Sequence, residues 1–347
     1  MFVRVSSVVV SLAVAAAAMA SVAAPELIAA TSVASAQTPP SPPTPPSQTQ
    51  PPPSSPPPPQ VGTPPSAPPP PPPPPPAVNL PPLTIKGTEQ MVDVGGRRLH
   101  GFVYGSGGPT VVLVSGFQAP QAYWNSVVPG IAEITTVVTY DRAGYGKSEK
   151  GDLPLHGRQS AADLHVLLGK LGVPKPYLLV GHSYGGRVVR LFAAAYPADT
   201  AGIILEDAGH EDLADAQLEA LIGKDRETLA ALIAPFRTPV PDPRTESDYM
   251  LATVEQLHQS GPLPHVPLVV ITSASRGSGL PPVLSPEGQA RVTEVAIAMQ
   301  KKLLDLVPGA EQILVEGAGH NIHLDKPEAV LAPIGTMIAR LRGQPAK

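Results

Sequence analysis

The most informative short pattern in the sequence is G-H-S-Y-G-G at residues 181–186, in which Ser183 has a glycine two residues before it and two after. The apolar residues 177–180 before it predict a buried strand, and the residues after it predict a helix. Small flanking residues let such a strand and helix approach each other closely, so that the serine hydroxyl is exposed on the turn. The start of the helix also favours developing negative charge. The pattern predicts a nucleophilic serine.

A serine hydroxyl needs a general base, and that base needs a carboxylate to orient it. Of the nine histidines, His320 is the best candidate, because it lies in a glycine-rich loop directly after the last predicted strand. His323, three residues further on in the same loop, is the alternative base. These two histidines have no third ligand nearby for zinc, and no metal or organic cofactor is expected. His182 lies beside Ser183, but its side chain is expected to point away from the position of a base.

The elements that must position these residues alternate along the chain. A hairpin is predicted around Gly95-Gly96, with flanking strands at residues 92–94 and 98–104. Short apolar runs then predict strands at residues 110–114, 134–140, 177–180, 201–205, 266–272 and 312–315, and amphipathic runs predict helices at 160–171, 184–196, 286–306 and 326–341. This alternation predicts an α/β fold with a mostly parallel, doubly wound sheet covered on both faces. The more polar residues 211–261 interrupt it and predict a helical cap insertion.

The order of these motifs resembles that of the α/β-hydrolase superfamily, and in particular its serine hydrolases and esterases. The matching blocks are spread over residues 92–341; besides the serine turn and the His320 loop they include residues 115–117, 140–148 and 204–207. A serine, then an acid, then a histidine is the order of catalytic residues in that fold. The similar haloalkane dehalogenases and epoxide hydrolases use an aspartate nucleophile, and Ser183 excludes both reactions.

The resemblance implies a catalytic acid, for which the chain offers two adjacent candidates. Most members carry it after the strand predicted at residues 266–272, but no carboxylate follows closely there. A subset carries it after the preceding strand, where Glu206 and Asp207 lie. Strand alternation sends their side chains to opposite faces, so only one can reach His320. The family's usual position aligns with Asp207, which we prefer; Glu206 is the alternative and is otherwise expected to be a surface or helix-capping charge.

The resemblance also implies an oxyanion hole formed by the backbone N–H groups of Phe117 and Tyr184. Asp141 and Arg142 lie in a turn that is mainly structural in this fold. The implied activity is cleavage of an ester-type acyl bond in a small-molecule substrate through an acyl-enzyme, as in a carboxylesterase, lipase or lactonase. Two alternatives stay open: a cofactor-free perhydrolase with the same triad, and a non-catalytic surface binding protein on the same scaffold.

The composition separates the chain into three parts. It has 347 residues with 48 prolines and no cysteine, and 26 of the prolines lie within residues 39–82. Residues 1–36 predict a signal peptide, with Arg4, an apolar run and an A-x-A cleavage site at its end; an uncleaved membrane anchor is the alternative. Residues 37–82 predict a disordered, extended Pro-rich linker. Residues 83–347 are long enough for one α/β domain with a large core.

These features predict an exported protein that is periplasmic, attached to the cell envelope or secreted. The Pro-rich linker either associates with the envelope or is a solvated spacer without a partner. A net charge of −4 gives no basic surplus for binding nucleic acid. The lack of cysteine excludes disulfide scaffolds, thiol catalysis and cysteine-ligated metals.

Overall fold

A computed structural model describes residues 80–274 and 283–343 of the chain. Within them, the strands form one eight-stranded sheet in the order β1-β2-β4-β3-β5-β6-β7-β8. Strand β2 pairs antiparallel with β1 and β4, and every other neighbouring pair is parallel. The strands are β1 Thr88–Asp93, β2 Arg98–Tyr104, β3 Thr110–Val114, β4 Val137–Tyr140, β5 Tyr177–His182, β6 Thr200–Glu206, β7 Leu268–Ser273 and β8 Glu311–Val315. The expected mostly parallel sheet is confirmed.

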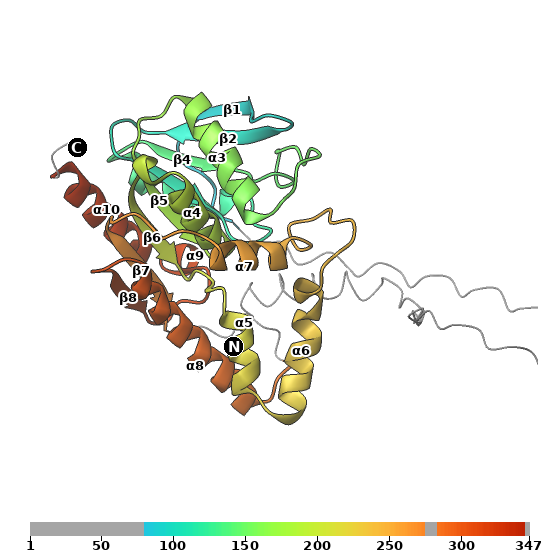
Figure 1. Ribbon diagram of the computed structural model, residues 1–347. Helices are drawn as coiled ribbons and strands as arrows, with labels where there is room; N and C mark the ends of the chain where they lie inside the picture. Colours follow the sequence, from blue (N-terminus) through green and yellow to red (C-terminus); the bar gives the residue numbers. More distant parts are fainter. Residues whose placement is uncertain (1–79, 275–282, 344–347) are drawn as a thin grey trace, which may run out of the picture.

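Helices cover both faces of this sheet, which explains why its central strands are apolar throughout (Figure 1). One face packs on α3 Gly157–Leu171, α4 Tyr184–Ala195, α7 Met250–His258 and the 3-10 helix η3 Leu303–Leu306. The other packs on the 3-10 helix η1 Gln121–Ser126 and on α2 Val128–Ala132, α9 Ile322–Asp325 and α10 Glu328–Arg342. In β3, Val112 and Val114 point to the first core, and Val111 and Leu113 point to the second.

Some elements begin or end at other residues than the sequence predicts. The hairpin of β1 and β2 is confirmed, with Asp93 opposite Arg98, but its first strand begins earlier than expected, at Thr88. The strand predicted at residues 134–140 begins only at Val137, because Ile134 caps the turn after α2 and is exposed. The helix predicted at residues 286–306 divides into α8, Pro286–Lys302, and η3.

Residues 211–261, which we call the cap, contain the helices α5 Leu213–Ala220, α6 Gly223–Arg237 and α7. In Figure 1, α5 and α6 project away from the sheet next to the start of α8, whereas α7 lies against α4. The outer part of the cap packs on α8 through a small apolar cluster, in which Leu221, Leu229 and Ile233 of the cap meet Leu284 and Val292. The cap is therefore packed on the sheet domain at two separate places.

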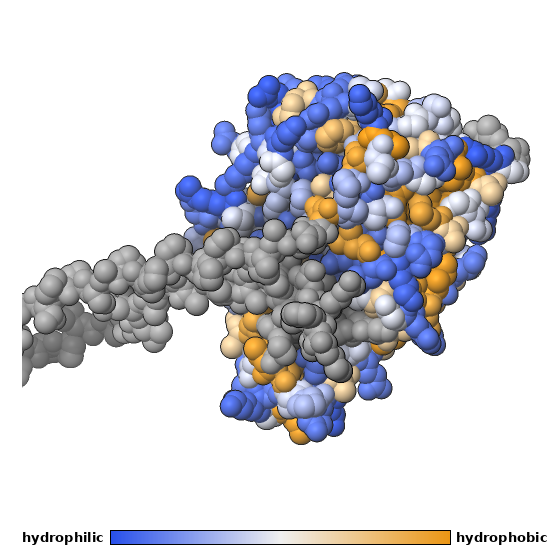
Figure 2. Space-filling model, turned by 180° about the vertical axis from the view of Figure 1, so that it is seen from behind, coloured by the Kyte–Doolittle hydropathy of each residue, from blue (hydrophilic) through white to orange (hydrophobic). Residues whose placement is uncertain are grey.

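The molecular surface seen from behind mixes hydrophilic and apolar residues (Figure 2). The exposed apolar side chains include Ile313 and Leu314 on β8, the edge strand. No helix in the described ranges is long and apolar enough to cross a membrane. The predicted signal peptide, and the predicted linker up to residue 79, lie outside the described residues.

Candidate active site

Ser183 lies on a sharp turn between β5 and α4. Its backbone angles are φ 52° and ψ −116°, a strained conformation for a residue other than glycine. A Cβ on Gly181 would lie 2.6 Å from the Gly185 carbonyl oxygen, and one on Gly185 would overlap the Val114 carbonyl, so both positions require glycine. The serine is partly exposed, and its hydroxyl makes no hydrogen bond with a described residue. In enzymes without substrate the bond from a nucleophile to its base is commonly long.

Asp207 and His320 form a close pair on the carboxyl side of the sheet. Their Oδ2 and Nδ1 atoms are 2.6 Å apart. Asp207 directly follows β6, has a positive φ of 41°, and donates its backbone N–H to the Ile271 carbonyl on β7 at 2.7 Å. Its side chain is fully buried, and that of His320 is 12% exposed. Because a carboxylate holds Nδ1, the Nε2 atom of the imidazole is left for proton transfer.

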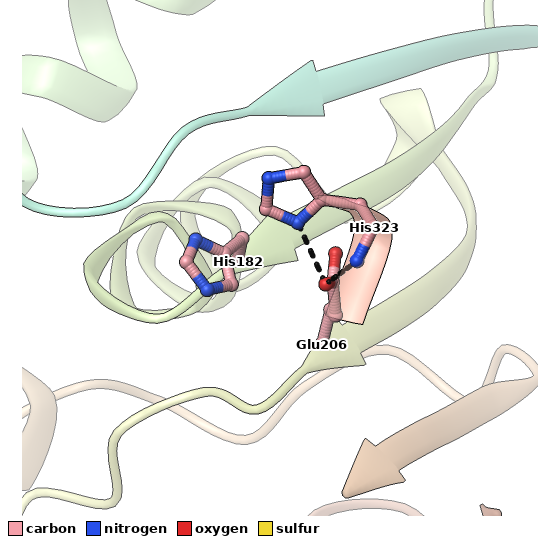
Figure 3. Close-up of side chains that lie close together, drawn as sticks. All are labelled: His182, Glu206 and His323. Atoms are coloured by element: carbon pink, nitrogen blue, oxygen red, sulfur yellow. Dashed lines mark hydrogen bonds and ion pairs between the residues drawn. The ribbon is translucent and has the colours of Figure 1, made fainter. Parts of the chain in front are cut away.

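Glu206 makes a second buried pair, with His323 (Figure 3). One carboxylate oxygen of Glu206 accepts from the backbone N–H of His323 at 2.8 Å and from its Nδ1 at 2.7 Å. Both side chains are 0% exposed, so the expected surface position of Glu206 is wrong. The expected helix-capping role agrees with its bond to the His323 N–H, which lies in the first turn of α9. Glu206 is the last residue of β6, Asp207 follows it with a positive φ, and each carboxylate meets a different histidine of the same loop.

His182 lies between the two histidines of that loop. Its ring centroid is 4.7 Å from that of His320 and 4.8 Å from that of His323, and its Nε2 is 3.0 Å from the His320 carbonyl oxygen. The ligand atoms of His182, Glu206 and His323 lie within 4.8 Å of one another. Glu206 Oε2 and His323 Nε2 are buried and have no hydrogen-bond partner among the described residues, so they are the atoms that could face an ion here. The hydrogen bonds of His182 and Glu206 hold the backbone of the His320 loop.

The loop after β3 lies against the serine turn, as an oxyanion hole would require. A Cβ on Gly116 would be 3.3 Å from the Ser183 Cβ. The next residue, Phe117, has its ring 6.2 Å from that of Tyr184 in an edge-to-face arrangement. The backbone N–H groups of Phe117 and Tyr184 donate to no described residue. Both are therefore available to a ligand oxygen.

Asp141 has the structural role that the sequence suggests. Its carboxylate lies 2.8 Å from Nδ1 of His100 and accepts from the backbone N–H of Gln121 at 2.8 Å and of Lys147 at 3.2 Å. These bonds tie the turn after β4 to β2 and to η1. The same contact holds the His100 side chain in place.

The profile of the alpha/beta hydrolase family matches residues 111–332, which span the serine turn, the Asp207 position and the His320 loop. The chain belongs to this family. Among the curated relatives, the uncharacterised protein YqjL of Bacillus subtilis is 26% identical over 232 residues, which are 65% of this chain and 82% of the relative. A soluble epoxide hydrolase of a Corynebacterium species is 36% identical over 106 residues, but these are only 30% of this chain and 36% of that protein.

Solved alpha/beta hydrolase structures show the same fold. The epoxide hydrolase CorEH superposes with a TM-score of 0.53 at 20% identity, covering 74% of this chain and all of that one. A bromoperoxidase from Bacillus anthracis gives a TM-score of 0.51 at 17% identity, covering 73% of this chain and all of that one. The family and its named hydrolases support a hydrolase on an α/β scaffold.

Proposed function

We propose that the protein is a serine hydrolase that cleaves an ester-type acyl bond through an acyl-enzyme at Ser183. The observation that carries the proposal is the 2.6 Å contact between Asp207 and His320 in a chain whose strained turn presents a serine. An alpha/beta hydrolase that opens epoxides or removes halides through an ester intermediate requires a carboxylate nucleophile. A hydroxyl at position 183 favours acyl transfer instead.

In the first half of the reaction, Ser183 Oγ attacks the acyl carbonyl carbon while His320 Nε2 takes the hydroxyl proton. Asp207 stabilises the resulting imidazolium through Nδ1. The N–H groups of Phe117 and Tyr184 donate to the oxyanion of the tetrahedral intermediate. His320 then gives its proton to the leaving alkoxide, and the alcohol departs.

In the second half, a water molecule attacks the acyl-enzyme. His320 accepts a proton from this water, the second tetrahedral intermediate collapses, and the proton returns to Ser183 Oγ. The products are the carboxylic acid and the regenerated enzyme. Every proton taken by His320 is returned to a leaving oxygen, and no atom changes its oxidation state in either half of the reaction.

A panel of p-nitrophenyl esters of increasing acyl length tests this proposal, with styrene oxide and fluoroacetate as comparison substrates. We expect turnover of at least one ester and none of the epoxide or the fluoroacetate. Turnover of an epoxide would contradict the assignment of Ser183 as the nucleophile. A protein that binds these esters but turns over none of them would be the non-catalytic binding protein, and peracid formation from acetate and hydrogen peroxide would indicate the perhydrolase.

We also propose that the enzyme acts outside the cytoplasm. The support is the sequence of residues 1–36, with its apolar run and A-x-A site, and the Pro-rich residues that follow. Expression of the full chain in a bacterial host, followed by N-terminal sequencing of the product, should give a mature protein that begins at Gln37. A product that keeps residues 1–36 would indicate the membrane anchor, and full-length protein in the cytoplasmic fraction would contradict export.

A further inference from the structure

Arg142, in the turn after β4, is a buried cation that connects the loop after β3 to the cap. Its side chain is 3% exposed. Nη1 donates to the Ser115 carbonyl at 2.6 Å, and Nη2 donates to the Gly116 carbonyl at 2.8 Å. Nε and Nη2 also donate to the two carboxylate oxygens of Glu246 at 2.8 and 2.9 Å. Glu246 lies in the cap between α6 and α7, and it is equally buried.

The bond to Gly116 determines the direction of a neighbouring N–H group. The carbonyl of Gly116 and the N–H of Phe117 belong to one trans peptide unit, in which the two groups point in opposite directions. When Arg142 holds the carbonyl on one side, the Phe117 N–H must point to the other side. The same loop touches Ser183 through Gly116. Arg142 therefore orients the donor proposed for the oxyanion hole.

The other proposed donor residue also touches this cation. The Arg142 guanidinium lies 5.2 Å from the ring centroid of Tyr184 and 5.5 Å from that of Tyr145. The Phe117 ring contacts Tyr184 and, at 6.3 Å, the ring of Phe236 in helix α6 of the cap. Arg142 thus contacts Tyr184 directly and the residue before Phe117, and Phe117 itself contacts the cap.

The charge of this arrangement is balanced inside the protein. Burial would lower the pKa of Arg142, but the Glu246 carboxylate raises it above its usual value, so the guanidinium stays charged. Loss of Glu246 would leave a buried cation without its counter-ion, which is unfavourable. The position of Arg142 therefore depends on a residue of the cap.

We infer that Arg142 and Glu246 are positioning residues that couple the cap to the peptide whose N–H stabilises the oxyanion. This inference rests on the proposed function. Neither residue is assigned a contact with substrate: each acts through the Gly116–Phe117 peptide. A displaced cap is expected to move Glu246, release the guanidinium and misdirect the Phe117 N–H.

The pair Arg190–Glu211 supplies a matched control. Arg190 in α4 also binds both oxygens of a glutamate, at 2.6 and 2.9 Å, and the side chains are 4% and 11% exposed. Lysine keeps the charge but lacks the planar fork of donors that both sites use. We expect Arg142→Lys to lower kcat for the best p-nitrophenyl ester by about 10- to 100-fold with KM changed by less than about threefold. Arg190→Lys should lower Tm by about as much as Arg142→Lys does, and it should leave kcat unchanged.

Two further measurements keep the test independent of folding and of activity. Glu246→Gln keeps the shape and one acceptor, so it should fold and give a smaller fall in kcat than Arg142→Lys. The Ala119 amide donates to the Gly116 carbonyl at 3.2 Å, so its hydrogen exchange reports on the loop. We expect this exchange to be about tenfold faster in Arg142→Lys than in Arg190→Lys if the loop opens locally.

Equal exchange at Ala119 in the two lysine variants, or an equal kcat in both, would overturn the inference while leaving the proposed function intact. A wild-type protein that hydrolyses no ester would overturn the proposed function. In that case the exchange rate at Ala119 would still decide whether Arg142 holds the loop.

Discussion

Ser183→Ala is expected to lower kcat/KM for the best p-nitrophenyl ester by about 10⁴- to 10⁶-fold, the loss seen when the nucleophile of such a triad is removed. The reason is that the strained turn places one hydroxyl beside the loop of Phe117, and alanine keeps the turn without the attacking oxygen. Steady-state hydrolysis, followed at high enzyme concentration, measures the residual rate.

Ser160→Ala, on helix α3, is the control for this substitution. It removes the same atom from a partly buried serine away from the turn, and it should leave kcat/KM unchanged. Equal circular dichroism spectra would show that both variants are folded. A Ser183→Ala variant that keeps more than about a tenth of the wild-type rate would mean that another group attacks the substrate.

Asp207→Asn is the second change with a large expected effect, a fall in kcat of about 10⁴-fold. The carboxylate accepts from His320 Nδ1, which fixes the tautomer that leaves Nε2 ready to accept the serine proton. An asparagine amide in that position can donate to Nδ1 and stabilise the wrong tautomer. Stopped-flow or steady-state hydrolysis near neutral pH measures the loss.

The neighbouring carboxylate provides the comparison. Glu206→Gln changes the same chemical group one residue away, on a side chain that faces His323. The glutamine keeps a side-chain oxygen that can accept from the backbone N–H and from Nδ1 of His323. We expect its kcat to stay within about tenfold of wild type, because the clamp on the loop survives. A larger loss in Glu206→Gln than in Asp207→Asn would move the role of catalytic acid to Glu206.

Much of the fold could be predicted from the sequence because each central strand is an apolar run bounded by turn residues. Strand β3 matches its predicted bounds, and β5 and β6 differ from theirs by one or two residues. The prediction was less accurate where packing decides the boundary. Ile134 is the first residue of the strand predicted at residues 134–140, but it lies exposed in the turn that ends α2.

The candidate site could be predicted where its residues belong to local motifs. The serine turn and the two carboxylates at the end of β6 could be predicted because each is defined by residues that are neighbours in the chain. The pairings between side chains that are distant in the sequence could not be predicted from it. Glu206 and His323 are 117 residues apart, and Arg142 and Glu246 are 104 residues apart. Two adjacent carboxylates and two histidines spaced by three were the only signal of the first pairing.

The most direct test of the central claim is mass spectrometric mapping of the protein after reaction with a fluorophosphonate, which traps the nucleophile of a serine hydrolase. We predict one adduct per chain, located on Ser183 and absent from Ser183→Ala. The rate of labelling should fall sharply in His320→Ala, because Nε2 of that residue activates the hydroxyl. An adduct on a different residue, or no adduct on a protein that hydrolyses esters, would contradict the account.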